Sequence, residues 1–370
     1  MNALGAMVSA IAVAGCTVTP AVSENTEAAE PPRVGEVEDF TDIRELCGDK
    51  DVTVAYLVIS ANNAARTIQR AEFDDEAGKC PNITKTLYVD SQSDPQRMRA
   101  NIDSLVAQGV DIIIAQDLGP ADLPAVRRAT AAGVQVVPFI SDPGGVPGRD
   151  YTAFVAENVD EFGKTLTDWV AAALGDKGSV IVLGGPAGNA YSHQVYLAVQ
   201  QALAEYPGMT LLGGDYLVTD WEVGKTQQAV AGALTKYPEI NGVIATYGGG
   251  SVGGIRAFLG AGRPLPVWAT SDANEFSCLW EQIAPSQPQF QIATQSLRPW
   301  MTRVALRHGL AAAQGIPDME PTIVNLPFFE DSIAGGELAP QCNPDLPPDA
   351  SLSTFLTEAQ LSELFTRGAS

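Results

Sequence analysis

The chain has 370 residues, which is enough for two domains of ordinary size. Its 44 Asp and Glu residues outnumber its 22 Lys and Arg residues, so the formal net charge is -22 and the sequence pI is near 4.3. Such an acidic chain repels phosphate backbones, which excludes nucleic acid as an expected partner. A hydrophobic content of 45% is typical of a folded core. With only two histidines, no metal centre and no cofactor are expected.

Residues 1–15 have the pattern of an export leader. Residues 4–15 form an uncharged apolar run that is too short to span a bilayer but suits a secretory signal. The run ends at Val13-Ala14-Gly15-Cys16, which resembles the lipobox of bacterial lipoproteins. The resemblance implies cleavage before Cys16, a lipid on its thiol, and a protein anchored at the cell envelope that faces the periplasm or the exterior. The first three residues carry no basic side chain, and a buried N-terminal helix is the alternative.

Residues 16–46 are predicted to form a disordered acidic tether. Between residues 17 and 45 the segment holds eight acidic residues, two arginines and few large apolar side chains. Such a stretch buries too little surface to offset the entropy of ordering. The expected arrangement is therefore a lipid anchor, a solvated tether and a folded body.

Four cysteines remain when Cys16 is set aside. An even number in an exported chain permits disulfides, and three pairings are possible. We favour Cys47–Cys80 and Cys278–Cys342, because Cys47 precedes the first strand and Cys80 ends the first helix of the same unit. Free buried thiols are the alternative. The chain has no CxxC spacing that would support a zinc or redox motif.

The body alternates apolar strands with helices in a regular succession. Strands are expected at residues 52–59, 83–89, 110–115, 134–140, 154–156, 179–183, 209–212, 242–246, 267–269, 291–294 and 322–325. Helices are expected between them, for example at residues 64–77, 94–108, 121–132, 161–174, 194–206 and 223–236. This rhythm predicts an α/β fold with parallel sheets.

This number of strand–helix units is too large for one open sheet. Two doubly wound, Rossmann-like lobes are therefore predicted. One lobe would comprise residues 47–156 and 296–326, and the other residues 157–295 and 327–370. In such sheets ligands bind at the carboxyl ends of the strands.

Amide, carboxylate and aromatic side chains follow the predicted strands. They include Asn63, Asp117, Ser141, Asp142, Tyr191, His193, Trp221, Tyr247, Asp272 and Gln295. Amides and carboxylates bond several hydroxyl groups each, and aromatic faces pack on the C–H face of a sugar ring. Apart from Arg66, no basic residue is expected at these strand ends. The predicted ligand is therefore neutral and hydroxyl-rich and carries no phosphate group.

The chain resembles the type I periplasmic binding proteins, in particular the ribose- and galactose-like receptors of ABC importers. The resemblance covers residues 52–325 and rests on residues 110–114, 133–138, 185–188, 219–221 and 237–243 and on Asp272. It implies two lobes joined by three crossovers that close on a sugar or polyol, no enzymatic activity, a monomer, and delivery of the ligand to a membrane permease. A receptor that presents its ligand to a membrane kinase is an alternative.

The resemblance also assigns contact residues. Asn63, Trp221, Asp272 and Gln295 fall at ligand positions of the family. Four further residues depart from its pattern: Ser141 and Asp142 stand for an Asp-Arg pair, His193 for an Arg, and Tyr247 for an Asn. The aromatic pair that the family has beside Asn63 is replaced by Ala64 and Ala65. No particular sugar follows from this set.

The glycine-rich segment 248–254 matches two other motifs. Its glycines fit the GxGxxG dinucleotide pattern, and Ser251 lies in a GxSxG pattern with Asp272 and His308 in hydrolase order. An exported serine hydrolase that uses Ser251, Asp272 and His308 is therefore the enzymatic alternative. Both motifs lie in the wrong structural context, because the segment is deep in the second series of strands and His308 is expected inside a helix. We expect these glycines to allow a helix end to approach a ligand or the facing lobe.

Overall fold

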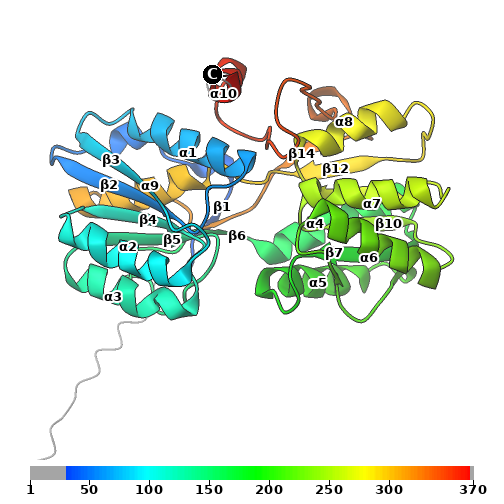
Figure 1. Cartoon of the computed structure of the whole chain (residues 1–370), viewed down its shortest axis with the longest axis horizontal. Coiled ribbons are helices and arrows are strands. Elements are labelled where there is room, and N and C mark those ends of the chain that lie inside the picture. Colours follow the sequence, from blue (N-terminus) through cyan, green and yellow to red (C-terminus); the bar gives the residue numbers. More distant parts are fainter. Residues whose placement is uncertain (1–30, 367–370) are drawn as a thin grey trace, which may run out of the picture.

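The computed structural model describes residues 31–366. The predicted leader, 1–15, and Cys16 lie outside the described residues. Two α/β lobes stand side by side, the first in blue and cyan and the second in green and yellow (Figure 1). Within the described residues, no helix is both long and apolar enough to cross a bilayer.

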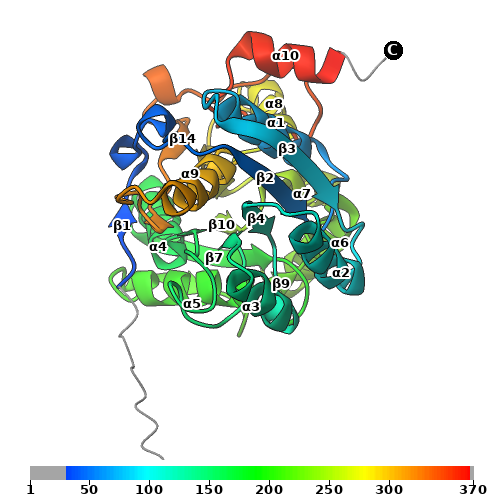
Figure 2. The ribbon, with the colours of Figure 1, turned by 90° about the vertical axis from the view of Figure 1, so that its left-hand side faces the viewer.

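The first lobe is built on a four-stranded parallel sheet in the order β3-β2-β4-β5. Its strands are β2 (Val52–Val58), β3 (Ile83–Asp90), β4 (Ile112–Gln116) and β5 (Gln135–Phe139). Its helices are α1 (Ala64–Ala77), α2 (Pro95–Ala107), α3 (Leu123–Ala131) and α9 (Met301–Gln314). Helices α1 and α9 lie on one side of this sheet, and α2 and α3 on the other (Figure 2). Successive β4 residues pack on opposite faces: Ile112 and Ile114 share a core with residues of α1 and α9, and Ile113 shares one with residues of α2 and α3.

The second lobe is built on a sheet in the order β14-β12-β11-β10-β7-β8, with β9 also paired to β7 and only β14 antiparallel. Its strands are β7 (Lys177–Gly184), β8 (Gly208–Leu211), β9 (Leu217–Val218), β10 (Gly242–Ala245), β11 (Val267–Ser271), β12 (Ile292–Gln295) and β14 (Phe328–Asp331). Its helices are α4 (Val159–Leu174), α5 (Ala190–Leu203), α6 (Val223–Lys236), α7 (Gly248–Gly260) and α8 (Asn274–Ile283).

A small parallel sheet joins the lobes. It has the order β1-β13-β6, from β1 (Val34–Gly35), β13 (Ile323–Val324) and β6 (Ala156–Glu157). The chain leaves the first lobe through β6, returns to it between β12 and α9, and leaves again between β13 and β14. The three predicted crossovers are therefore present.

The predicted tether is wrong for residues 34–46. Val34 and Gly35 form β1 beside β13, and a short 3₁₀ helix, Ile43–Glu45, carries Ile43 and Leu46 into the core of the first lobe. Val37 and Phe40 pack against that core as well. The acidic residues of this segment are exposed while a sparse set of apolar residues is buried, and the high charge of the segment conceals that spacing.

The C-terminal segment makes a fourth connection. After β14, residues 343–355, here called the strap, run from α8 of the second lobe to α1 of the first, and α10 (Glu358–Thr366) packs on α1 (Figure 1). Ala64 and Ile68 of α1 share an apolar cluster with Leu346 and Leu361. Helix α10, which we expected in the second lobe, therefore lies on the first.

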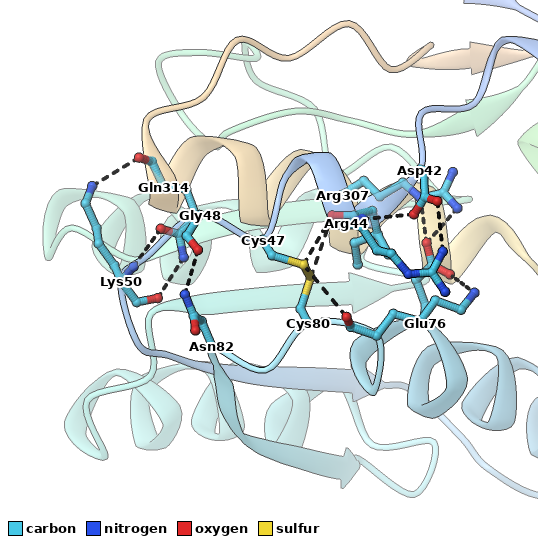
Figure 3. The surroundings of a disulfide bond; sticks show 12 residues. Asp42, Arg44, Cys47, Gly48, Lys50, Glu76, Cys80, Asn82, Arg307 and Gln314 are labelled. Atoms are coloured by element: carbon cyan, nitrogen blue, oxygen red, sulfur yellow. Dashed lines mark hydrogen bonds and ion pairs between the residues drawn. A yellow bond between two sulfur atoms is a disulfide. The ribbon is translucent and has the colours of Figure 1, made fainter.

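Both expected disulfides are confirmed: Cys47 pairs with Cys80, and Cys278 with Cys342. Figure 3 shows the first of them beside the anchoring of the N-terminal segment. There the Asn82 side chain donates to the Gly48 carbonyl, and the Gln314 amide exchanges hydrogen bonds with the backbone of Lys50. The second disulfide fixes the start of the strap to α8.

We expect the double substitution Cys278→Ser/Cys342→Ser to lower the free energy of unfolding by about 4 kcal/mol, because it removes a cross-link over 64 residues. The matched double substitution Cys47→Ser/Cys80→Ser removes a disulfide that spans only 33 residues. It should lower the free energy of unfolding by about 0.6 kcal/mol less than the first double substitution does. Guanidinium unfolding of the oxidised proteins measures both values. Equal stability of wild type and both variants would contradict a structural role for the disulfides.

Candidate functional site

The carboxyl ends of both large sheets point toward the crossovers, and the chain turns sharply there. Non-glycine residues with a left-handed backbone follow several strands: Asp117 after β4, Ile140 after β5, Asp220 and Trp221 after β9, and Arg298 after β12. Each such backbone conformation costs of order 1–3 kcal/mol of stability, and it persists only where the surrounding structure holds it in place. This strain is collected where the sequence predicted a ligand site.

Arg66, Asp117 and Ser141 form the polar wall of the first lobe. An Arg66 guanidinium nitrogen lies 2.5 Å from an Asp117 carboxylate oxygen, and the Ser141 hydroxyl donates to the other oxygen at 3.2 Å. Burial opposes the charge of Arg66, but the Asp117 carboxylate outweighs it and raises the pKa of Arg66. The wall is thus charged but locally neutral.

Asn63 and Asp142 lie near this wall and are exposed. The Asn63 side chain caps α1 by accepting from the Arg66 backbone N–H at 2.9 Å. Asp142 accepts from the Gly144 backbone N–H at 2.7 Å. Each cap uses one side-chain oxygen and leaves the remaining polar atoms of these two side chains toward solvent.

Trp221 and Tyr247 form the wall of the second lobe and line one small pocket together with Thr246 and Ser251. The Trp221 indole N–H donates to the Thr246 hydroxyl at 2.9 Å. The indole lies flat on Gly185, where a Cβ atom would come within 2.5 Å of the ring. Burial raises the pKa of Tyr247 to about 12, with a further contribution from Asp349 of the strap. The Tyr247 hydroxyl therefore stays protonated at neutral pH.

His193 stands apart from this pocket. It is exposed on α5, its Nδ1 lies 3.4 Å from Asp215, and its ring stacks on Tyr196. A cavity of about 500 Å³ between α6 and α7 is lined by none of the predicted site residues.

Asp272 is held by the strap. Its side chain is 1% exposed, and its oxygens accept from the backbone N–H groups of Leu297, Leu352 and Ser353 and from the hydroxyls of Ser351 and Ser353. Burial raises the pKa of Asp272, although these donors act in the opposite direction. The expected contact with a ligand is thus replaced by hydrogen bonds within the chain, which the sequence could not reveal because the donors of the strap lie some 80 residues away.

The strap is bonded to both lobes. On the second lobe, the Asn274 side chain donates to the carbonyls of Asn343 and Leu346 at 2.8 and 3.1 Å. On the first lobe, Asp349 accepts from the Ala64 backbone N–H at 3.0 Å, and the Phe355 backbone N–H donates to a Glu72 oxygen at 2.7 Å. Asp349 was not among the predicted site residues, because it does not follow a predicted strand in the sequence.

Gln295 lies at the end of β12, beside Asp272. Its backbone carbonyl accepts from the Asp272 N–H at 2.9 Å, and its side-chain nitrogen donates to the Leu326 carbonyl at 3.0 Å. Arg298, three residues further on, pairs with Glu157 of β6. Sequence analysis missed both, because Arg298 follows the strand end by three residues and Glu157 sits inside a two-residue strand.

The hydrolase alternative is wrong. His308 lies in α9 of the first lobe, where its ring nitrogens contact Asp318 and the Pro321 carbonyl. Asp272 is occupied by the strap, and the Ser251 hydroxyl donates to the Tyr247 carbonyl at 3.1 Å. No proton relay links the three, because His308 and Asp272 already bond elsewhere.

The glycines of α7 serve packing. A Cβ atom at Gly253 would lie 1.9 Å from the Val223 carbonyl oxygen of α6, and one at Gly248 would lie 2.1 Å from the Ser271 carbonyl oxygen after β11. Only glycine permits these approaches, so the GxGxxG match reflects helix packing. Among the described residues, no group of acidic, histidine or cysteine side chains is arranged to hold a metal ion.

Two α/β lobes linked by three crossovers define a type I periplasmic binding protein fold. The periplasmic binding protein domain family matches residues 54–280, more than half of the chain, so the chain belongs to that family. The periplasmic solute-binding protein of an ABC transporter from Actinobacillus succinogenes, solved with bound D-allose, superposes with a TM-score of 0.64 over 75% of this chain and 96% of that one, at 20% identity. The arabinose-binding protein AraP of Geobacillus stearothermophilus gives the same TM-score and coverage at 18% identity.

Two curated relatives align at greater identity. The xylitol-binding protein of Mycolicibacterium smegmatis is 26% identical over 191 residues, which is 51% of this chain and 53% of that protein. The ribose import binding protein RbsB of Escherichia coli is 27% identical over 213 residues, 57% of this chain and 69% of that protein. The chain thus matches about half the length of the first relative and two thirds of the second.

The substitution Asp272→Asn should lower the melting temperature and reduce the free energy of unfolding by about 2–4 kcal/mol, because the new amide N–H₂ group would face backbone N–H donors. Asp345→Asn, an exposed position of the strap, is the control and should be neutral. Thermal unfolding of both variants measures the difference. Identical melting of Asp272→Asn and wild type would contradict the anchoring role.

Glu330 predicts a pH dependence of stability. Burial raises its pKa from 4.5 to about 7, against the hydrogen bonds from Gln341, Ser277 and Thr294. The folded protein therefore binds this proton more tightly than the unfolded chain does. Stability should fall as pH rises from about 4.5 to about 7, by about 3 kcal/mol.

The variant Glu330→Gln should flatten that decline, whereas Glu337→Gln, at an exposed position, should leave it unchanged. Urea unfolding at pH 5 and at pH 8 distinguishes the two variants. A decline of the same size in Glu330→Gln as in wild type would assign it to other groups.

Proposed function

We propose that this chain is the solute-binding component of an ABC importer and binds a neutral sugar or polyol between its lobes. The observation that carries the proposal is the set of amide, hydroxyl and aromatic side chains at the strand ends of both lobes, around a hinge of three crossovers. The ligands named for similar proteins, ribose, xylitol, D-allose and arabinose, belong to the same chemical class.

The proposed contacts come from both lobes. They are Asn63 and Asp142 of the first lobe and His193, Trp221, Tyr247 and Gln295 of the second. Asp272 is proposed to act through the strap that it anchors. A ligand bonded to both walls favours the closed arrangement of the lobes, so that binding shifts a hinge equilibrium and creates the surface that a membrane permease recognises.

We also propose that the mature protein starts at a lipid-bearing Cys16 and works outside the cytoplasm as a monomer. The two disulfides support an oxidising compartment, because such bonds persist in exported proteins. Labelling of the full chain with a radioactive fatty acid, and its loss in Cys16→Ser, would test the anchor.

A thermal-shift screen tests the ligand class. D-Ribose, D-allose, L-arabinose and xylitol are offered to the purified protein, and a ligand present at 100 times its dissociation constant should stabilise it by about 2.7 kcal/mol. Glucose 6-phosphate is the charged comparison and should give no shift. No response to any sugar or polyol would overturn the proposed function.

Trp221→Ala should weaken binding of the sugar found in that screen at least about tenfold, because it removes an aromatic face from the pocket. Trp280→Ala is the matched control, since its indole also donates one hydrogen bond, to the Phe290 carbonyl, but lies on α8 away from the pocket. Isothermal titration gives both affinities. Equal affinities in the two variants would remove Trp221 from the site.

A further inference from the structure

Three buried side-chain oxygens at the hinge lack a hydrogen-bond partner within the described residues. They are Glu157 Oε1, Tyr191 Oη and Gln295 Oε1. Glu157 belongs to the first crossover and Gln295 precedes the second, while Tyr191 lies in the first turn of α5. Buried polar atoms are almost always bonded in folded proteins, so three unpaired oxygens in one region indicate a place where a polar molecule binds.

Arg298 connects these residues. Its Nε pairs with Glu157 Oε2, and its guanidinium carbon lies 5.7 Å from the centre of the Tyr191 ring. The Gln295 side chain donates a hydrogen bond to the Leu326 carbonyl. Leu326 lies two residues after Val324, and Val324 is the neighbour of Glu157 in the small sheet, so Gln295 lies near the Arg298–Glu157 pair. Arg298 therefore links Glu157 to Tyr191 where the crossovers meet, and Gln295 lies on the adjoining crossover.

The backbone of Arg298 is strained. Its φ is +57° directly before Pro299, although the residue before a proline favours an extended conformation. A glycine would adopt this conformation without the steric penalty of a side chain. Strain that persists at a buried, charged residue indicates a role in function beyond stability.

We propose that Arg298, Glu157 and Tyr191, together with Gln295, form the floor of the ligand site and bind two neighbouring hydroxyl groups of the sugar or polyol. This inference rests on the proposed function. It adds Arg298 and Glu157, which neither the sequence motifs nor the comparisons assign, to Tyr191 and Gln295, which the sequence analysis already placed after predicted strands. The oxygens of Glu157 and Gln295 accept hydrogen bonds from ligand hydroxyls, and the Tyr191 hydroxyl donates one or accepts one. Arg298 pairs with the Oε2 atom of Glu157 and orients its carboxyl group.

The charges of the floor select a neutral ligand. Arg298 and Glu157 form an ion pair of opposite charges, and the three unpaired oxygens beside it are two acceptors and one hydroxyl group. A ligand carboxylate or phosphate would face the Glu157 and Gln295 oxygens at close range, whereas hydroxyl groups satisfy them. Burial raises the pKa of Tyr191, so its hydroxyl remains a donor at neutral pH.

The decisive variant is Tyr191→Phe, which removes an oxygen that has no partner among the described residues. If the hydroxyl served only the fold, its loss would leave affinity unchanged. We expect the opposite: an unchanged or higher melting temperature and affinity for the sugar lowered about tenfold. Tyr206→Phe is the matched control, because its hydroxyl bonds Asp168 on the surface, and it should bind as wild type does.

Arg298→Lys keeps the charge but loses the planar guanidinium, and it should also weaken binding about tenfold. Monodeoxy analogues of the bound sugar supply a second measurement. The analogue that lacks the hydroxyl facing Tyr191 should have a lower affinity for the wild type than the parent sugar has. For Tyr191→Phe, the analogue and the parent sugar should have equal affinities.

The outcomes separate this inference from the proposed function. Wild type that binds no sugar or polyol overturns the proposed function, and the floor with it. Wild type that binds a sugar, beside a Tyr191→Phe variant of equal affinity, overturns the floor alone. If Arg298→Lys fails to fold, Tyr191→Phe and the deoxy analogues still decide.

Discussion

Parallel strands place all their carboxyl ends on one edge of a sheet, and in this protein two such edges meet at the crossovers. Backbone groups at a strand end have no further neighbour in the sheet, so the chain must turn there and satisfy them with side chains. Polar side chains gather after these turns: Asn63 caps α1, Thr246 accepts from the Trp221 indole, and Asp117 pairs with Arg66. We propose that such residues are also the ones available to a ligand. The architecture of the sheets therefore locates the site before any particular side chain does.

Buried charge at this edge is compensated inside the chain. Asp272 accepts hydrogen bonds from uncharged donors of the strap, and Arg298 forms an ion pair with Glu157. On the first lobe, Arg303 of α9 binds Glu72 and Glu76 of α1, and Glu72 in turn accepts from the strap. Isolated buried charges are costly, so each of these groups requires a partner from a distant part of the chain. The pairs consequently join α9, the crossovers and the strap to the two lobes.

The strap changes the balance of contacts that the family resemblance implied. Ser351 and Ser353 offer hydroxyls to Asp272 as a sugar would, and their hydrogen bonds leave no free acceptor on that carboxylate. At the same time the strap brings Asp349 to the N-terminus of α1, close enough to Tyr247 to affect its pKa. A fourth connection also restricts how far the lobes can separate, because it is fixed to α8 by hydrogen bonds and by the Cys278–Cys342 disulfide.

Local pattern predicted the succession of strands and helices, the α/β class and the favoured disulfide pairing, because apolar periodicity, caps and cysteine positions are properties of neighbouring residues. It also placed Trp221, Tyr247 and Gln295 at strand ends. The three crossovers were expected from the family resemblance. Tertiary structure alone decided that residues 34–46 are folded, that Asp272 is bonded to the strap, and that Arg298 pairs with Glu157 and lies beside Tyr191. Those facts depend on contacts between residues about 80 or more positions apart, and no local spacing encodes which of many distant partners a buried charge will meet.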